Sequence, residues 1–141
     1  MKFYFDENFP KHIVEGLRSF QAGRLAEGID LVYIPDICGR GAKDEEIIPV
    51  IAKESGILIT HDISMKRSRM LGPLLEQCRV SAFFFQPPRG SEYKYWQMVE
   101  LVVQHWCSMK SVALEKPPPF SYAVRPRSKQ PIDLDADRRR R

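Results

Sequence analysis

The 141 residues suffice for one domain, since a domain usually takes about 100–200 residues. Hydrophobic residues make up 43% and charged residues 28%, which excludes wholesale disorder, and no apolar run approaches the ~20 residues needed to cross a bilayer. The net charge of +4 lies entirely in residues 125–141, because residues 1–124 carry 15 basic and 15 acidic side chains. We therefore predict a neutral domain over residues 1–124 and a basic, flexible tail over residues 125–141 that ends in four arginines.

Strands and helices are expected to alternate along the chain. Short apolar segments predict strands at residues 2–5, 31–34, 57–60 and 80–85, with an edge strand at 120–124. Apolar residues at three- and four-residue spacing predict helices at 10–20, from 44 towards 56, around 70–75 and at 92–109. This alternation favours an α/β fold with three layers, α/β/α, in which helices cover both faces of a mostly parallel sheet of four to five strands.

The last of these helices carries three large aromatic residues, Tyr95, Trp96 and Trp106. Stacked aromatic side chains can bind RNA bases. Their helical spacing, however, favours packing in the core or in a dimer interface over a base-stacking surface.

Acidic residues gather where strands end. Asp6 directly follows the first strand, Asp62 follows the third, and Asp44 and Glu45 begin the helix between the second and third strands. If the first and third strands are neighbours, right-handed crossovers place all four residues at one edge of the sheet. Each like-charge pair at ~4 Å costs about 4 kcal/mol at an effective dielectric constant of ~20. Each acid taken alone is more typical of a helix cap or a turn, but the shared placement of the set favours a divalent cation that offsets this repulsion.

Oxygen ligands of this kind suit Mg²⁺, and no Cys/His cluster competes for a softer metal. The three cysteines are widely spaced and are interpreted as reduced thiols of a cytoplasmic protein. The first residues lack the apolar segment of a signal peptide, so secretion is not expected.

Three ordered blocks, at residues 5–10 (FDENFP), 40–48 (RGAKDEEII) and 58–62 (LITHD), resemble the compact bacterial PIN-like proteins. These are relatives of the PIN-domain ribonucleases that act as toxins in type II toxin–antitoxin pairs, and the resemblance covers approximately residues 1–110. It implies a PIN-like fold and Mg²⁺- or Mn²⁺-dependent hydrolysis of RNA phosphodiester bonds. It also implies a cognate antitoxin and a homodimer, neither of which a residue here specifies.

The resemblance assigns the catalytic, metal-binding acids to Asp6, Asp62 and either Asp44 or Glu45. Supporting polar positions match Glu7, Asn8 and Thr60. Ser64 stands where related sequences often carry a further acid, so one bound ion or two remain open. Basic residues beside the acidic blocks are expected to steer the RNA backbone, unless they are ordinary solvated surface charge: Arg40, Lys43, Lys66, Arg67 and Arg69.

Two other functions fit parts of this pattern. A catalytically weak PIN-like module that binds RNA or a protein would explain Ser64 in place of an acid. A phosphoreceiver-like signalling module also has acids after its first and third strands, but it needs a lysine at the end of its last strand, where residues 85–88 read Phe-Gln-Pro-Pro. It also has no use for the acids at Asp44 and Glu45.

Overall fold

The computed structural model describes residues 1–86 and 94–136, so the arginines at 138–141 and the proline-rich segment after residue 86 lie outside the described residues. One sheet of six strands has the order β2-β1-β3-β4-β5-β6. The first five strands are parallel and the sixth is antiparallel. The strands are β1 (Lys2–Phe5), β2 (Asp30–Tyr33), β3 (Ile57–Thr60), β4 (Ser81–Phe85), β5 (Ser121–Val124) and β6 (Ile132–Asp133).

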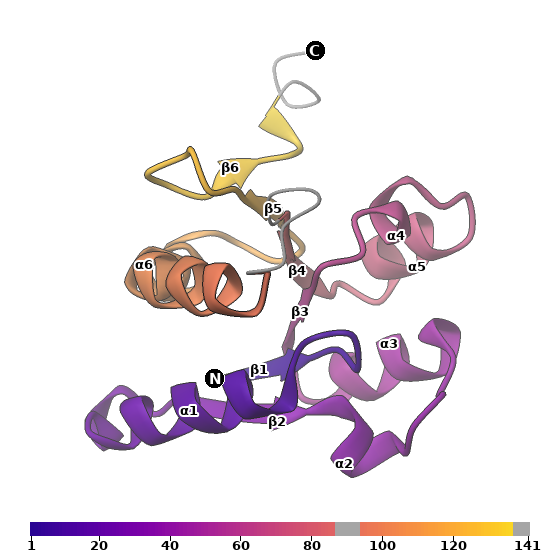
Figure 1. Cartoon of the computed structure of the whole chain (residues 1–141). Coiled ribbons are helices and arrows are strands. Elements are labelled where there is room, and N and C mark those ends of the chain that lie inside the picture. Colours follow the sequence, from indigo (N-terminus) through magenta and orange to yellow (C-terminus); the bar gives the residue numbers. More distant parts are fainter. Residues whose placement is uncertain (87–93, 137–141) are drawn as a thin grey trace.

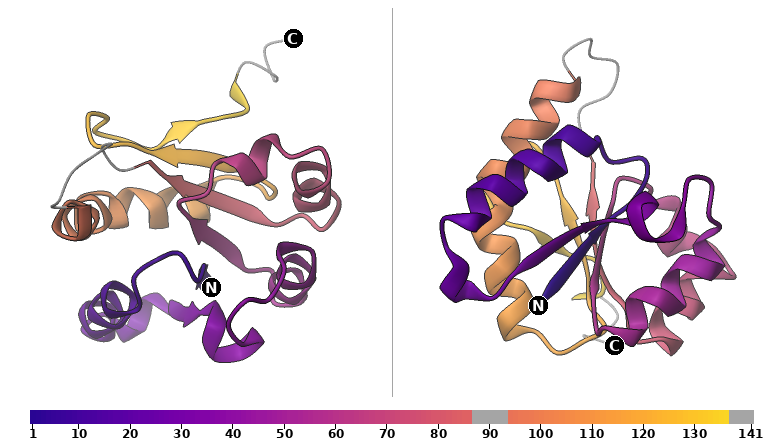
Figure 2. Two further views of the ribbon diagram at one scale, coloured as in Figure 1. Left: turned by 45° about the vertical axis from the view of Figure 1, so that its right-hand side comes forward. Right: turned by 90° about the horizontal axis from the view of Figure 1, so that it is seen from below.

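Helices cover both faces of this sheet, which confirms the predicted three-layer α/β/α fold (Figure 1). Helices α1 (Lys11–Ala22) and α6 (Lys94–Glu115) lie on one face, and a short 3₁₀ turn (Leu25–Glu27) follows α1. The other face carries α2 (Ile34–Cys38), α3 (Asp44–Lys53), α4 (Ser64–Arg67) and α5 (Leu71–Gln77). The view from below separates the two helical layers clearly (Figure 2, right).

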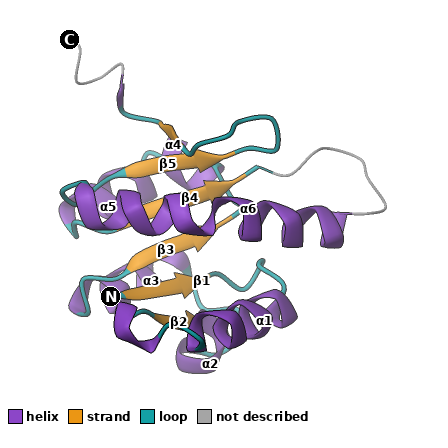
Figure 3. Ribbon diagram, turned by 90° about the vertical axis from the view of Figure 1, so that its left-hand side faces the viewer, coloured by secondary structure: helices purple, strands orange, loops and turns teal. Residues whose placement is uncertain are grey.

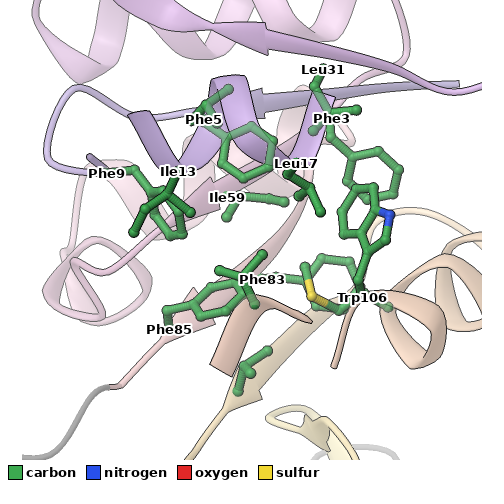
Figure 4. Packing of buried hydrophobic residues seen from close by; sticks show 14 of the residues in the cluster. Phe3, Phe5, Phe9, Ile13, Leu17, Leu31, Ile59, Phe83, Phe85 and Trp106 are labelled. Atoms are coloured by element: carbon green, nitrogen blue, oxygen red, sulfur yellow. The ribbon is translucent and has the colours of Figure 1, made fainter. Parts of the chain in front are cut away.

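The strands are continuously apolar because both of their faces are buried, as in other parallel sheets. Alternate residues such as Phe3, Phe5 and Phe83 pack against α1 and α6 (Figure 4). Their neighbours Tyr4 and Phe84 point to the opposite face, against α3 and α5. Two apolar layers therefore hold the sheet rigid, and its carboxyl-end edge is a fixed platform.

The sheet extends further than the sequence indicates. Ala123 in β5 pairs with Ile132, so residues 132–133, in the segment expected to be a tail, form a sixth strand. The sheet therefore has six strands, where four to five were expected. Leu134 packs against the core on the α3–α5 side, and Asp135 forms an ion pair of 2.9 Å with Lys66 in α4. These contacts hold the described part of the segment, up to residue 136, against the domain.

Helix α6 differs from its prediction at both ends. It runs on to Glu115, and its first turns project past the carboxyl ends of the strands (Figure 3). Packing in the core or in a dimer interface was predicted for the aromatic residues of this helix; Trp106 is buried in the core, whereas Trp96, with an exposed fraction of 65%, is not. Tyr95 is also exposed, because the sheet does not reach this end of the helix. No helix within the described residues is long and apolar enough to span a membrane.

Candidate active site

The acidic residues meet at the carboxyl-end edge because β1 and β3 are neighbours. Phe5 lies opposite Ile59 in the parallel ladder, and the backbone N–H of Asp6 donates to the Ile59 carbonyl at 2.9 Å. This register places Asp6 beside Thr60. The strand order, on which the sequence argument depended, is therefore the one that brings the ends of β1 and β3 together.

Asp6 is held rigidly, with an exposed fraction of only 7%. The hydroxyl of Thr60, which is fully buried, donates to Asp6 Oδ2 at 2.9 Å. The backbone N–H of Glu7 donates to the other oxygen, Oδ1, at 2.8 Å. Each carboxylate oxygen keeps a further lone pair, so the side chain can still accept a cation or a proton donor from the open side.

Asp62 is fixed to the same hydroxyl. Its backbone N–H donates to Thr60 Oγ1 at 3.1 Å, which makes Thr60 the link between the two aspartates. The backbone N–H of Ser64 donates to Asp62 Oδ1 at 3.1 Å, and the Ser64 hydroxyl donates to the same oxygen. Ser64 therefore orients Asp62 and begins α4 at the same time.

Asp44 completes the cluster from the first turn of α3. Burial raises the pKa of its carboxyl above the usual range, and the charges of Asp6, Asp62 and Glu45 raise it further, in that order of strength. Asp44 therefore interacts more strongly with Asp6 and Asp62 than with its own chain neighbour. Glu45, in contrast, is exposed on α3.

The loops around the site are tied to one another. Both carboxylate oxygens of Glu7 accept from the backbone N–H of Gly41 at 3.2 Å, and Gly41 has a φ of +74°, which favours glycine. The imidazole of His61 contacts the backbone carbonyl of Asn8, whose own side chain is exposed. Glu7 and Asn8 thus connect the three segments of the site, with Glu7 directed at the loop before α3.

One buried ring anchors the segment after Asp6. Phe9 is fully buried and makes edge-on contacts with Phe5 and Phe85 at centroid distances of 5.2 and 5.4 Å (Figure 4). Its backbone N–H donates to the Asp6 carbonyl at 2.9 Å. This turn determines where the Asp6 side chain lies relative to β3.

The donor chemistry at this edge fits a hard divalent cation. Three carboxylates, of Asp6, Asp44 and Asp62, interact electrostatically across β1, α3 and β3, and oxygen ligands of this kind suit Mg²⁺ or Mn²⁺. In the described ranges, no three Asp, Glu, His or Cys side chains already stand close enough to hold one ion together. A bound ion would therefore require the carboxylates to draw together, which its charge favours.

Basic residues lie around the acids in different settings. Arg40 approaches Glu7 Oε1 at 3.9 Å, and Lys43 occupies the N-cap position of α3, where its exposed side chain makes no capping hydrogen bond. Lys66 forms an ion pair with Asp135. Arg67 and Arg69, which follow Asp62 in the chain, have exposed side chains.

Two residues at the same edge escaped the sequence interpretation. Gln86 directly follows β4 and Arg125 directly follows β5, and Arg125 Nε donates to Gln86 Oε1 at 2.6 Å. The rule that parallel strands end at one edge could have found both residues, since each stands one position after its strand. The charge count instead assigned Arg125 to the tail.

Comparison with known proteins adds one match. A family model described as a PIN like domain matches residues 1–87, which is more than half of the chain and includes all four acids. No curated protein and no solved structure matches the chain.

Proposed function

Because the chain belongs to the PIN-like domain family, we propose that it is a metal-dependent ribonuclease that hydrolyses RNA phosphodiester bonds. The observation that carries this proposal is the juxtaposition of Asp6 and Asp62 where the neighbouring strands β1 and β3 end, joined through the buried Thr60 hydroxyl. Asp44 in α3 is near enough for the charges of both to raise its pKa, after the larger effect of burial. A protein gains no stability from such repulsion. It is expected where a cation and a phosphate complete the charge balance.

Asp6, Asp44 and Asp62 are the proposed ligands of Mg²⁺ or Mn²⁺, with Asp44 preferred to Glu45 because Glu45 is exposed. When bound, the ion would supply Lewis-acid polarisation of the scissile phosphodiester. Thr60 holds Asp6 in position through its hydroxyl, and Ser64 does the same for Asp62. The exposed cations Arg40, Lys43, Arg67 and Arg69, together with Lys66, are the proposed contacts to the RNA backbone.

The direct experiment is RNA cleavage with Mn²⁺ or Mg²⁺, with and without EDTA. We expect Asp6→Asn and Asp62→Asn to abolish cleavage, because each keeps the side-chain shape and removes the charge that binds the ion. Glu46→Gln is the matched control, since Glu46 is exposed in the same first turn of α3 as Asp44. Cleavage that survives both aspartate substitutions, or that EDTA leaves unchanged, would refute the metal site.

A PIN-like module that binds RNA without cutting it is the second candidate. Ser64 in place of an acid favours it, because the carboxylates available for a second ion are then fewer. Wild-type protein that binds Mn²⁺ and RNA without turnover would select this candidate over the nuclease.

The role of toxin in a toxin–antitoxin pair, with a cognate antitoxin and a homodimer, remains part of the proposal. Apolar side chains between α1 and α6 offer the surface that a protein contact needs, with exposed fractions of 70% for Phe20 and 65% for Trp96. Growth arrest on expression of the wild type, but not of Asp6→Asn, would support the toxin. Sedimentation of purified protein would decide between monomer and dimer.

A further inference from the structure

A hollow of about 480 Å³ lies between α4, α5 and the segment after β5. Among the described residues that line it, Lys66, Arg67 and Arg125 are basic and Glu76 and Asp135 are acidic. The lining also includes Ile63, which directly follows Asp62 in the chain. The hollow is therefore lined by charged side chains and begins beside the candidate active site.

Its position follows from the sheet. Strands β3, β4 and β5 are parallel neighbours, so Asp62, Gln86 and Arg125 all lie just beyond their carboxyl ends. Neighbouring strands are ~4.8 Å apart, which places the end of β5 roughly 10 Å from the end of β3. A nucleic-acid strand with a phosphate at the acids would carry its next phosphates along this edge.

One of the two acidic side chains in the lining, Asp135, is paired with a basic residue of the hollow. Asp135 Oδ1 lies 2.9 Å from Lys66 Nζ, and only about one fifth of each side chain is exposed (21% and 20%). Asp135 is held in place from its own side, because its backbone N–H donates to Asp133 Oδ1 at 2.9 Å and Leu134 packs against the core. The Asp135 carboxylate therefore shows that the hollow has room for a negatively charged oxygen group in contact with the Lys66 ammonium.

Two guanidinium groups complete the lining. Arg125 Nε donates to Gln86 Oε1, which holds this edge of the planar guanidinium group, and the group carries further N–H donors that can bind an oxyanion. Arg67 follows Lys66 on α4 and is exposed. Planar guanidinium groups bind phosphate oxygens in pairs, which suits a phosphodiester better than a single carboxylate.

We infer that this hollow is a binding site for a backbone phosphate of the RNA strand, next to the phosphate that is cut. Arg67 and Arg125 bind the phosphate, and Lys66 joins them when it leaves Asp135. The inference rests on the proposed function for the identity of the strand. Lys66 and Arg67 lie within the family match at residues 1–87, whereas Arg125 and Asp135 lie beyond it, so the two parts of the chain form the site together.

The test measures, by fluorescence anisotropy, how tightly the full chain binds a short single-stranded RNA in the presence of EDTA. Arg125→Gln should lower the slope of log K against log salt by about 0.7, which corresponds to a roughly tenfold loss of affinity near 50 mM salt. Arg127→Gln is the matched control. Arg127 lies two residues after Arg125, carries the same charge and is exposed, but it does not line the hollow. The substitution should leave affinity close to that of the wild type.

Asp135→Asn tests the role of Lys66 in the opposite direction. The substitution removes the competing charge and keeps an oxygen for the lysine, so RNA binding should tighten and the salt slope should steepen. Arg67→Gln provides a second loss variant on a different element, and near-ultraviolet circular dichroism verifies the fold of each protein. Equal affinities for Arg125→Gln and Arg127→Gln, or weaker binding by Asp135→Asn, would overturn the inference.

Cleavage measured in parallel with Mn²⁺ separates this inference from the proposed function. Arg125-dependent RNA binding without any cleavage would leave the hollow as a binding site and refute the nuclease. Cleavage that is unaffected by Arg125→Gln, with unchanged binding, would refute the hollow and leave the nuclease. Wild-type protein that binds no RNA but binds an acidic peptide through Arg125 would overturn the RNA inference in favour of a protein ligand.

Discussion

Thr60 is the position where a single atom supports two residues of the site. Its buried hydroxyl donates to Asp6 Oδ2 at 2.9 Å and accepts from the backbone N–H of Asp62 at 3.1 Å. Thr60→Val keeps the shape of the side chain and removes both hydrogen bonds. The perturbation therefore isolates the hydroxyl from the packing of β3.

The expected loss follows from these two bonds. A hydrogen bond to a charged group contributes about 1.5–3 kcal/mol, and a backbone N–H left without its partner costs a further ~1 kcal/mol or more. Thr60→Val should thus lower the free energy of unfolding by about 2–4 kcal/mol, measured by urea denaturation. It should also weaken Mn²⁺ binding in titration calorimetry by about 10–100-fold, the usual effect of losing a group that orients a ligand.

Thr60→Ser is the matched control, since it keeps the hydroxyl and loses one buried methyl group at a cost of about 1 kcal/mol. Its affinity for Mn²⁺ should remain near that of the wild type. The reasoning is refuted if Thr60→Val unfolds within about 0.5 kcal/mol of the wild type, which is the range of ordinary surface substitutions. It is refuted equally if both variants lose the same stability and the same affinity.

Three further predictions test the electrostatics. Burial and acidic neighbours raise the pKa of Asp44, so its charge destabilises the metal-free protein at neutral pH. Asp44→Asn should then raise the melting temperature more than Glu45→Gln does, and an equal or lower value would contradict the cluster. The ammonium of Lys110 lowers the pKa of Glu27 from 4.5 to about 2, so Glu27→Gln should be destabilising at neutral pH, and urea unfolding should show the difference fading as the pH falls from 4.5 to 2. Burial lowers the pKa of His105 from 6.5, so the unfolded chain takes up a proton first and stability declines below that pH; His105→Leu should flatten this decline, and parallel stability curves for the two proteins would disprove it.

The sequence was informative where local pattern and sheet geometry agree. The apolar run at 57–60 is a central strand because both of its faces are buried, and the acids after β1 and β3 share an edge because the strands are parallel. The position of Trp96 outside the core could not be predicted, because helical spacing identifies a face but not the point at which a helix extends past the sheet. Strand β6 could not be predicted either, because two residues pair only where β5 offers a free edge, a condition that local sequence does not encode.

The preference for Asp44 over Glu45 as a proposed ligand comes from the structure and not from the sequence. Both residues begin α3, and either could face the sheet as far as spacing shows. Burial and the charges of Asp6 and Asp62 act on Asp44, while Glu45 is exposed. The rotation of the helix about its own axis, which depends on how the core isoleucines of α3 pack, makes the difference.

The position of β4 has a consequence for how the chain is made. The family match ends at residue 87, directly after β4, whose five residues are all buried and include Phe83–Phe85. A chain ending there would leave this apolar strand as an open edge, ready to pair with another molecule. During synthesis this edge of β4 stays unpaired until α6 and β5 have been made, and over that interval the growing chain is prone to aggregate. By pairing with β4, strand β5 protects the apolar edge of the preceding strands from aggregation.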